Sequence, residues 1–308
     1  MYARVRSITP DNQQPIYSLD VSPDGGQLAL GQQGDGLGSP SLSLWSIGDG
    51  RLLSVVENDD FGLPLATRYA PDGKTLAYVN SSFSVSLHDL ESGKTNILPL
   101  DNSRVQWLAY AQKRNRLVVA GTLTQVWDGE RGEVIWTLPE RPASPDADQP
   151  PAVAALNPDG TQLAVAGGDE GNILIYDIEG NHVVQTLTGA TPELRWISYD
   201  HQGRYLAAID WHSHGTFLWD LRTGERHLAD FLNQDVEAYW CLDFHPGGEH
   251  IALGMLSGYV VAVSLEDGRF LLDEQPHAGR VWGLAFSPDG KYLVTGGDDA
   301  TAHIWESR

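Results

Sequence analysis

Short apolar runs that alternate with polar positions recur along the whole chain, and sequences typical of tight turns separate them. Val85-Ser86-Leu87 and Ile173-Leu174-Ile175 are two examples of such runs. Short β-rich runs bounded by turn residues are typical of strands, whereas an amphipathic helix needs apolar positions at a sustained period of about 3.6 residues. No stretch of the sequence carries that helical period. The pattern therefore predicts an all-β protein built from short antiparallel strands.

One turn sequence recurs seven times. Its clearest copies are Ser22-Pro23-Asp24-Gly25 and Ser287-Pro288-Asp289-Gly290. Proline fixes φ at the second turn position and glycine supplies a positive φ, so each copy predicts a tight turn between two strands. The second positions of the seven copies are Pro23, Pro71, Gln112, Pro158, His201, Pro246 and Pro288. Their spacing of 41 to 48 residues is close to the roughly 40–45 residues of one four-stranded propeller blade.

A second mark follows each turn, about fourteen to sixteen residues later. It ends a short β-rich run, and a further turn rich in glycine and acidic residues comes after it. The seven copies are Trp45-Ser46, His88-Asp89, Trp127-Asp128, Tyr176-Asp177, Trp219-Asp220, Val263-Ser264 and Trp305-Glu306. Two turns and the runs around them predict four strands in each repeat.

The last repeat resembles the WD-repeat family most faithfully. It carries His277, a strand and turn over 281–290, Thr295, Asp299 and Trp305 in the order of the family's motif. The resemblance covers essentially the whole chain. It implies one domain over residues 1–308, a seven-bladed β-propeller of four-stranded antiparallel blades.

The resemblance also implies a structural role for four of these residues. In that family the His, a strand Ser or Thr, the turn Asp and the Trp form a hydrogen-bonded network inside the blade, which we transfer to His277, Thr295, Asp299 and Trp305. We interpret the His–Asp pair as stabilising the blade, not as catalytic. Other repeats depart from the motif, because Glu170 replaces the turn Asp in the fourth and Val263 replaces the Trp in the sixth.

The two ends of the chain complement each other in this scheme. The sequence stops at Arg308, directly after the third predicted strand of the last blade, which spans about 277–308. Residues 2–8 precede the first turn by the distance expected of the missing fourth strand. We therefore expect the N-terminal strand to pair beside residues 302–305 and close the ring of blades, which would protect the strand edges.

Net charge limits the classes of partner. The chain has 41 acidic and 20 basic residues and a formal charge of −21, so its field repels nucleic acid and anionic membranes and favours basic proteins. Keeping the protein soluble is an equally good explanation of the charge. Residues 1–14 are polar and Cys241 is the lone cysteine, which leads us to expect a cytoplasmic protein without a disulfide. No cofactor motif is recognisable.

In the WD-repeat family, one face formed by the loops between blades usually docks partners. Aligning the repeats on their turns places Tyr17, Trp240 and Trp282 at the entrances of the innermost strands of three neighbouring blades, with Arg280 and Arg195 beside them. Trp, Tyr and Arg dominate binding hot spots. The acidic loop residues assigned to the same face are Asp59, Asp60, Asp146, Asp148, Asp169, Glu170, Glu193, Asp235, Glu237 and Asp298.

These observations predict a non-catalytic protein-interaction scaffold. We expect a freestanding, monomeric propeller that works within a larger complex and binds a protein partner, with a basic peptide or domain as one candidate. The predicted partner-binding residues are Tyr17, Arg195, Trp240, Arg280, Trp282 and Asp298. The alternative interpretation of the three aromatic residues is that each is buried in the core of its blade.

Other features of the sequence leave further alternatives open. A propeller enzyme or metal-binding protein would use the mouth of the central channel, which Glu193 and Asp243 approach in this scheme. His212 and His214 have the spacing of two metal ligands on one side of a strand, although a solvated turn explains them equally simply. The insertions at 32–41 and 139–151 are either recognition loops or neutral insertions.

Overall fold

The computed structural model describes residues 1–32, 42–56, 66–80, 82–100, 105–139, 153–167, 171–191, 194–210, 215–226 and 238–308. Within these ranges the regular secondary structure consists of 28 β-strands in seven four-stranded antiparallel sheets. Residues 1–100 and 239–308 form one compact unit, and residues 101–238 form another. We call each sheet a blade and number the blades as the repeats are numbered.

Four blades make up the first unit. Blade 1 comprises β2 (Ile16–Val21), β3 (Gln27–Gln32), β4 (Leu42–Ser46) and β5 (Leu52–Val55), and blade 2 comprises β6 (Thr67–Tyr69), β7 (Thr75–Val79), β8 (Val85–Asp89) and β9 (Thr95–Ile97). Blade 6 comprises β22 (Tyr239–Phe244), β23 (His250–Met255), β24 (Val260–Ser264) and β25 (Phe270–Glu274). Blade 7 comprises β26 (Val281–Phe286), β27 (Tyr292–Gly297), β28 (Ala302–Ser307) and β1 (Tyr2–Ile8).

Three blades make up the second unit. Blade 3 comprises β10 (Trp107–Tyr110), β11 (Arg116–Ala120), β12 (Thr124–Asp128) and β13 (Glu133–Thr137). Blade 4 comprises β14 (Ala154–Leu156), β15 (Gln162–Gly167), β16 (Asn172–Asp177) and β17 (His182–Leu187). Blade 5 comprises β18 (Leu194–Tyr199), β19 (Tyr205–Asp210), β20 (Thr216–Asp220) and β21 (Glu225–Arg226).

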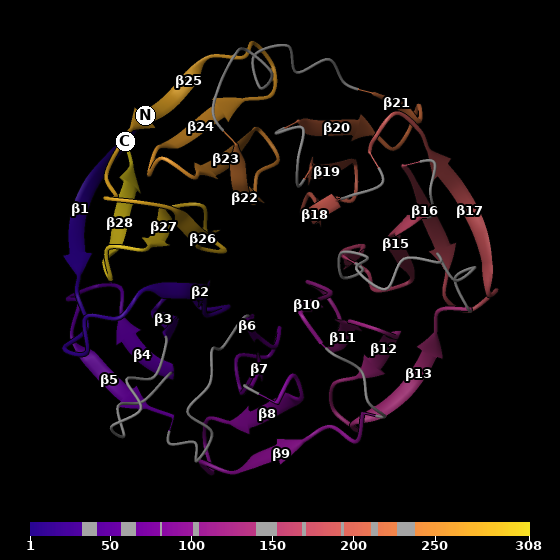
Figure 1. Ribbon diagram of the computed structural model, residues 1–308, viewed down its shortest axis with the longest axis horizontal. Helices are drawn as coiled ribbons and strands as arrows, with labels where there is room; N and C mark the ends of the chain where they lie inside the picture. The colour runs from indigo at the N-terminus through magenta and orange to yellow at the C-terminus, as the bar shows by residue number, and fades with distance from the viewer. Residues whose placement is uncertain are drawn as a thin grey trace. The chain divides into compact units, whose positions relative to one another are not determined.

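Neighbouring blades within each unit meet through their first strands. In the first unit, β26 contacts β22 on one side and β2 on the other, and β2 also contacts β6. In the second unit, β14 contacts both β10 and β18. Figure 1 shows these first strands on the inner side of each unit and the last strands on its outer side. The fold class predicted from the sequence, all-β with seven blades of four antiparallel strands, is confirmed.

The recurring turn has a local hydrogen-bond pattern that explains its sequence. The Ser22 hydroxyl donates to Asp24 Oδ1 at 2.5 Å and accepts the backbone N–H of Gln27 at 2.9 Å. Asp24 Oδ1 also accepts the N–H of Gly26. Gly25 has φ +72°, which an L side chain rarely adopts. Short polar side chains thus satisfy the backbone donors that the turn leaves without a strand partner.

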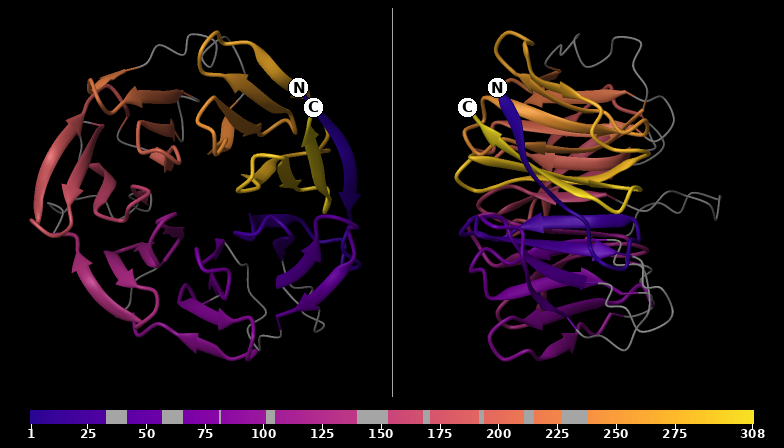
Figure 2. Two further views of the ribbon diagram at one scale, coloured as in Figure 1. Left: turned by 180° about the vertical axis from the view of Figure 1, so that it is seen from behind. Right: turned by 90° about the vertical axis from the view of Figure 1, so that its left-hand side faces the viewer.

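The N-terminal strand completes blade 7, as predicted. β1 pairs with β28 in antiparallel register from Tyr2 opposite Ser307 to Ile8 opposite Ala302, with a bulge between Arg4 and Arg6. Both views in Figure 2 show β1 alongside β28, with the two chain ends next to each other. The bulge was not foreseen, because an extra residue in a strand leaves no mark in the alternation of so short a run.

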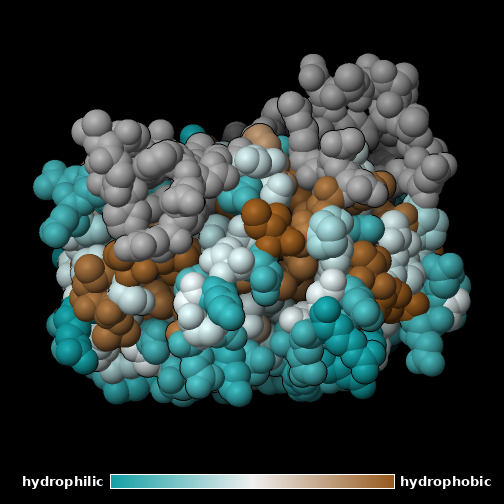
Figure 3. Space-filling model, turned by 90° about the horizontal axis from the view of Figure 1, so that it is seen from below, coloured by the Kyte–Doolittle hydropathy of each residue, from teal (hydrophilic) through white to brown (hydrophobic). Residues whose placement is uncertain are grey.

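Apolar side chains pack between adjacent blades. The cluster between blades 7 and 1 contains Ile16, Leu28, Val294 and Ile304, all of them fully buried. The outermost strands are different. Leu52 of β5 is 48% exposed and Ile97 of β9 is 64% exposed, and Figure 3, viewed from the side of these strands, shows apolar patches among hydrophilic surface.

Candidate functional site

Three aromatic residues from three neighbouring blades form one continuous cluster. Tyr17 lies on β2, Trp282 on β26 and Trp240 on β22. The Trp282 ring centroid is 4.8 Å from that of Tyr17 and 5.3 Å from that of Trp240, and both pairs meet edge to face. All three side chains are partly exposed. The prediction of an aromatic arc placed these residues on neighbouring strands, and the structure brings them into contact.

Each of these residues is the extra residue of a β-bulge. The pairing register shifts between Ile16 and Ser18 in β2, at Tyr17, and it shifts in the same way at Trp240 and Trp282. A bulge leaves one residue outside the ladder and redirects its side chain. The shared position therefore turns the three aromatic side chains away from the blade cores, against the alternative that they are core residues.

Arg280 is held between the two tryptophans. Its guanidinium carbon lies 3.9 Å from the Trp240 ring centroid and 4.3 Å from that of Trp282. A guanidinium over an indole face is attracted by the ring's negative face, most strongly where water is excluded. We call Tyr17, Trp240, Arg280 and Trp282 the aromatic patch.

Asp298 fixes the geometry of this patch from the turn between β27 and β28. Its Oδ1 accepts the indole N–H of Trp282 at 2.5 Å, and its Oδ2 accepts the backbone N–H of Arg280 at 3.0 Å. Gly279 has φ +118°, and a Cβ on it would lie 2.9 Å from the Asp298 Cβ. Asp298 was predicted as an exposed acidic contact residue. It is exposed, and both its oxygens also hold the patch in place.

Arg195, the remaining predicted contact residue, belongs to the second compact unit. It lies on β18, where the register shifts between Leu194 and Trp196. Arg195 thus occupies the bulge position that corresponds to Tyr17. In the same unit Trp196 meets Trp107 of β10 at a centroid distance of 4.6 Å, with the rings nearly perpendicular.

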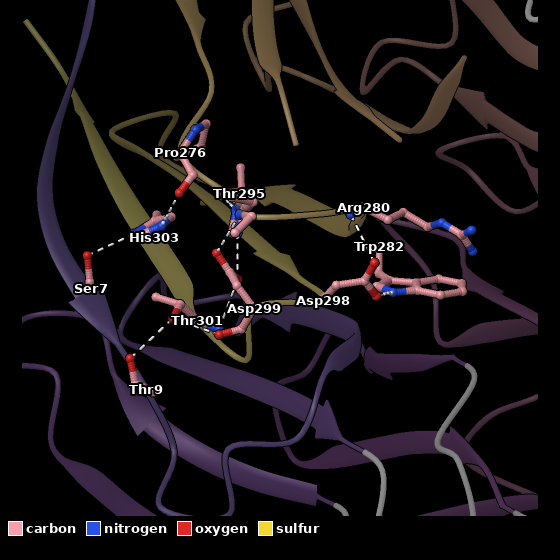
Figure 4. A network of polar contacts seen from close by, with 12 residues as sticks. Ser7, Thr9, Pro276, Arg280, Trp282, Thr295, Asp298, Asp299, Thr301 and His303 are labelled. Atoms are coloured by element: carbon pink, nitrogen blue, oxygen red, sulfur yellow. Dashed lines mark hydrogen bonds and ion pairs between the residues drawn. The ribbon is translucent and has the colours of Figure 1, made fainter. Parts of the chain in front are cut away.

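The four residues assigned to an internal network are hydrogen-bonded within blade 7. His277 Nδ1 lies 3.0 Å from Asp299 Oδ1, and His277 Nε2 lies 2.9 Å from the Thr295 hydroxyl. The indole N–H of Trp305 donates to the same hydroxyl at 3.3 Å. Figure 4 shows Thr295 and Asp299 of this network beside Arg280, Trp282 and Asp298. Because Asp298 and Asp299 are consecutive, one turn anchors both the network and the aromatic patch.

The histidine cluster of blade 7 serves this network. His277, Asp299 and His303 place potential metal-ligand atoms within 4.8 Å of one another. Both ring nitrogens of His303 are engaged, however, one with the Ser7 hydroxyl at 2.8 Å and the other with the Pro276 carbonyl at 3.1 Å. Burial, and then the nearby His277, lower the pKa of His303 to about 4. Through these two contacts His303 of β28 joins β1 and the segment before β26.

A second histidine cluster lies at the turn of blade 6. His245, Glu249 and His250 also bring potential ligand atoms within 4.8 Å. The two imidazoles stack with centroids 4.1 Å apart and planes 24° apart. Both ring nitrogens of His245 are engaged, one with the Gly290 carbonyl at 3.2 Å and the other with the backbone N–H of Gly247 at 3.1 Å. His250 Nε2 lies 2.6 Å from the Tyr2 hydroxyl, and burial lowers the pKa of His250 to about 4.

Two carboxylates on the first strands carry shifted pKa values. Asp20 Oδ2 accepts the N–H of Tyr69 at 2.7 Å, and Asp243 Oδ2 accepts the N–H of Phe286 at 2.9 Å, each across a blade boundary. Burial raises the pKa of both to about 6, although those backbone bonds and the Arg68 charge oppose the shift. The sequence analysis named Asp243 for the alternative of an enzyme or metal site at the mouth of the central channel. In the structure Asp243 holds the backbone of the next blade.

Several predicted features fall outside the described residues. They are the metal candidates His212 and His214, the channel-mouth candidate Glu193, the acidic residues 59, 60, 146, 148, 169, 170, 235 and 237, and residues 33–41 and 140–151 of the two insertions. Among the residues that the structure does describe, no helix is long and apolar enough to cross a membrane.

Comparison with known proteins connects this architecture to the WD repeat. Residues 266–306 match the family model described as WD domain, G-beta repeat. The chain is 28% identical over 156 residues to Actin-interacting protein 1-2 of Arabidopsis thaliana, which covers 49% of this chain and 25% of that protein. It is 26% identical over 158 residues to Protein SOF1 of Saccharomyces cerevisiae, a match that covers 50% of this chain and 31% of that protein.

A further relative is WD repeat-containing protein 1 of Gallus gallus, 29% identical over 165 residues, which covers 52% of this chain and 26% of that protein. The matches thus take in about half of this chain and a smaller share of each relative. Together with seven four-stranded blades, they confirm the resemblance to the WD-repeat family.

Proposed function

We propose that this WD-repeat chain is a non-catalytic platform that docks a protein partner on the aromatic patch. WD-repeat relatives support a protein-interaction role in general. The observation that carries the proposal is the arrangement of Trp240, Arg280 and Trp282, three side chains of the types that dominate binding hot spots, packed together and partly exposed. Rigid aromatic anchors lose little conformational entropy on binding.

The placement of the patch on β-bulges supports the same function. Bulges redirect side chains at a cost in ladder hydrogen bonds. Here three neighbouring blades carry one at the same strand position, and an aromatic residue occupies each of the three. A purely structural role would favour returning these side chains to the apolar core, where their burial stabilises the fold.

The charge of the chain supports a basic partner. With a formal charge of −21, the platform attracts basic surfaces over distances of about a Debye length and steers their approach. The same charge weighs against nucleic acid as a partner. We further propose a cytoplasmic location within a larger complex, with the propeller itself a single copy. Cys241 is buried and forms no disulfide, which fits a reducing compartment.

Affinity purification from native cells tests the platform. Wild type, the double variant Trp240→Ala/Trp282→Ala and the control Phe270→Ala are compared, and bound proteins are identified by mass spectrometry. Phe270 is an aromatic residue of the same unit, 49% exposed on β25. We expect a stoichiometric partner with wild type and the control, and its loss from the double variant. If a correctly folded double variant retains the partner, the aromatic patch is not the docking site.

A further inference from the structure

We propose that Arg280 is the recognition element of the aromatic patch and binds the side-chain carboxylate of an aspartate or glutamate in an internal segment of the partner. This inference rests on the proposed function and names the chemistry of its central contact. It concerns short-range pairing, whereas the preference for a basic partner concerns the long-range field. A partner that is basic overall and presents one carboxylate beside apolar residues satisfies both.

The guanidinium is fixed in place before any partner arrives. It lies between Trp240 and Trp282, with its carbon 3.9 Å and 4.3 Å from the two ring centroids. The Arg280 backbone N–H and the Trp282 indole N–H are both bound by Asp298. Binding therefore immobilises little of the arginine side chain, which otherwise has one of the largest rotamer entropies to lose.

The positive charge of Arg280 has no carboxylate partner among the described residues. None of the ion pairs in that part of the chain includes Arg280. Asp298, the adjacent acidic residue, accepts the backbone N–H of Arg280 and leaves the guanidinium unpaired. Arg280 Nε is buried without a hydrogen-bond acceptor. The site thus holds a cation, in a strongly acidic chain, that no carboxylate of the described residues neutralises.

The shape of the site selects a carboxylate. Figure 4 shows the Arg280 side chain running beside Trp282, with its guanidinium end directed away from Asp298. The two terminal nitrogens of a guanidinium form a fork that matches the two oxygens of a carboxylate. Aromatic surface on both sides lowers the local dielectric and strengthens such a pair. The single negative charge of a carboxylate also suits this acidic chain better than a phosphate dianion does.

Peptides blocked at both ends provide the test. The probe is Ac-Leu-Glu-Leu-NH2, and the matched peptides carry Gln, Lys or phosphoserine in place of Glu. Binding is followed by the emission of the patch tryptophans and by the NMR signal of the Arg280 Nε–Hε pair, which the Arg280→Gln variant assigns. We expect the Glu peptide to shift this signal and to bind about tenfold more tightly than the Gln and Lys peptides.

Two variants of the protein complete the design. Arg280→Gln is expected to abolish the preference for Glu over Gln. The control Arg226→Gln alters another arginine stacked on an aromatic ring, Phe217 at 4.7 Å, and is expected to retain the preference. Equal binding of the Glu and Gln peptides, no binding of any peptide, or a preference for phosphoserine would each overturn the inference.

Failure of this inference and failure of the proposed function give different experimental results. A cellular partner that is lost from Trp240→Ala/Trp282→Ala but retained by Arg280→Gln would leave the platform in place and refute the carboxylate contact. A partner retained by the double tryptophan variant would refute the docking site, whatever the peptides do.

Discussion

The buried carboxylate of Asp243 is expected to make stability fall as the pH rises from about 4 to above 6. Burial raises its pKa from 3.8 to about 6, despite hydrogen bonds from the Phe286 and Phe244 backbones. The unfolded chain loses this proton near pH 4 and the folded chain near pH 6. The unfolded state therefore binds fewer protons between those values, and the free energy of unfolding decreases as the pH rises.

The magnitude follows from the size of the shift. A shift of roughly two pKa units corresponds to about 3 kcal/mol, at about 1.4 kcal/mol per unit. This is an upper limit, because the side chain retains some solvent exposure. Asp243→Asn removes the titration, so the difference in unfolding free energy between wild type and variant should fall by up to that amount between pH 4 and pH 7. Any constant cost of the amide cancels from this change.

Urea denaturation at a series of pH values measures the effect. Asp289→Asn serves as the control of opposite sign, because the Ser287 hydroxyl lowers the pKa of Asp289. Its stabilising contribution is present above about pH 4 and is lost as the pH falls through the lowered pKa. If the wild-type and Asp243→Asn curves stay parallel between pH 4 and pH 7, burial does not control this carboxylate and the argument fails.

Three further substitutions test single contacts, each by urea unfolding followed through tryptophan fluorescence. Thr295→Val removes the acceptor of the buried Trp305 N–H and should cost about 1–3 kcal/mol; an unchanged midpoint would show that the network does not stabilise blade 7. Tyr2→Phe removes the hydroxyl bound to His250 and should cost about 1 kcal/mol. Unchanged stability of this variant would show that the contact contributes nothing in solution. Gly279→Ala places a Cβ at φ +118° against the Asp298 side chain and should cost more than about 1 kcal/mol. It should also change the fluorescence of the patch tryptophans, and a variant with unchanged stability and fluorescence would refute this argument.

The blades could be predicted because their determinants are local. The turn at Ser22 and its copies, together with short apolar runs, were enough to place the strands, and the same pattern predicted that β1 pairs with β28. Side chains of the turn itself satisfy its backbone hydrogen-bond donors, so the turn can be predicted without knowledge of distant residues. The network of His277 and Thr295 was implied by the resemblance to the WD-repeat family, and its members lie within one blade.

The parts that were missed depend on neighbouring strands. The bulges at Tyr17, Trp240 and Trp282 are changes of register between two strands, and no residue type specifies them. The sequence placed Arg280 beside the aromatic residues, whereas its position between two rings depends on the spacing of two blades. The bond from Asp243 to the next blade also joins residues about forty positions apart, beyond the reach of a repeat pattern.

The pairing of the first and last strands has a consequence for circular permutation of the chain. Tyr2 lies opposite Ser307, and the Arg308 N–H donates to the Met1 carbonyl at 2.8 Å. Joining the two ends would therefore convert the pairing most distant in sequence into a hairpin with a two-residue loop, the shortest common length. A circular permutant would retain the pairing of β1 with β28 from Tyr2 to Ile8 while lowering the loop-closure entropy of forming it, and it should fold faster than the present order of strands.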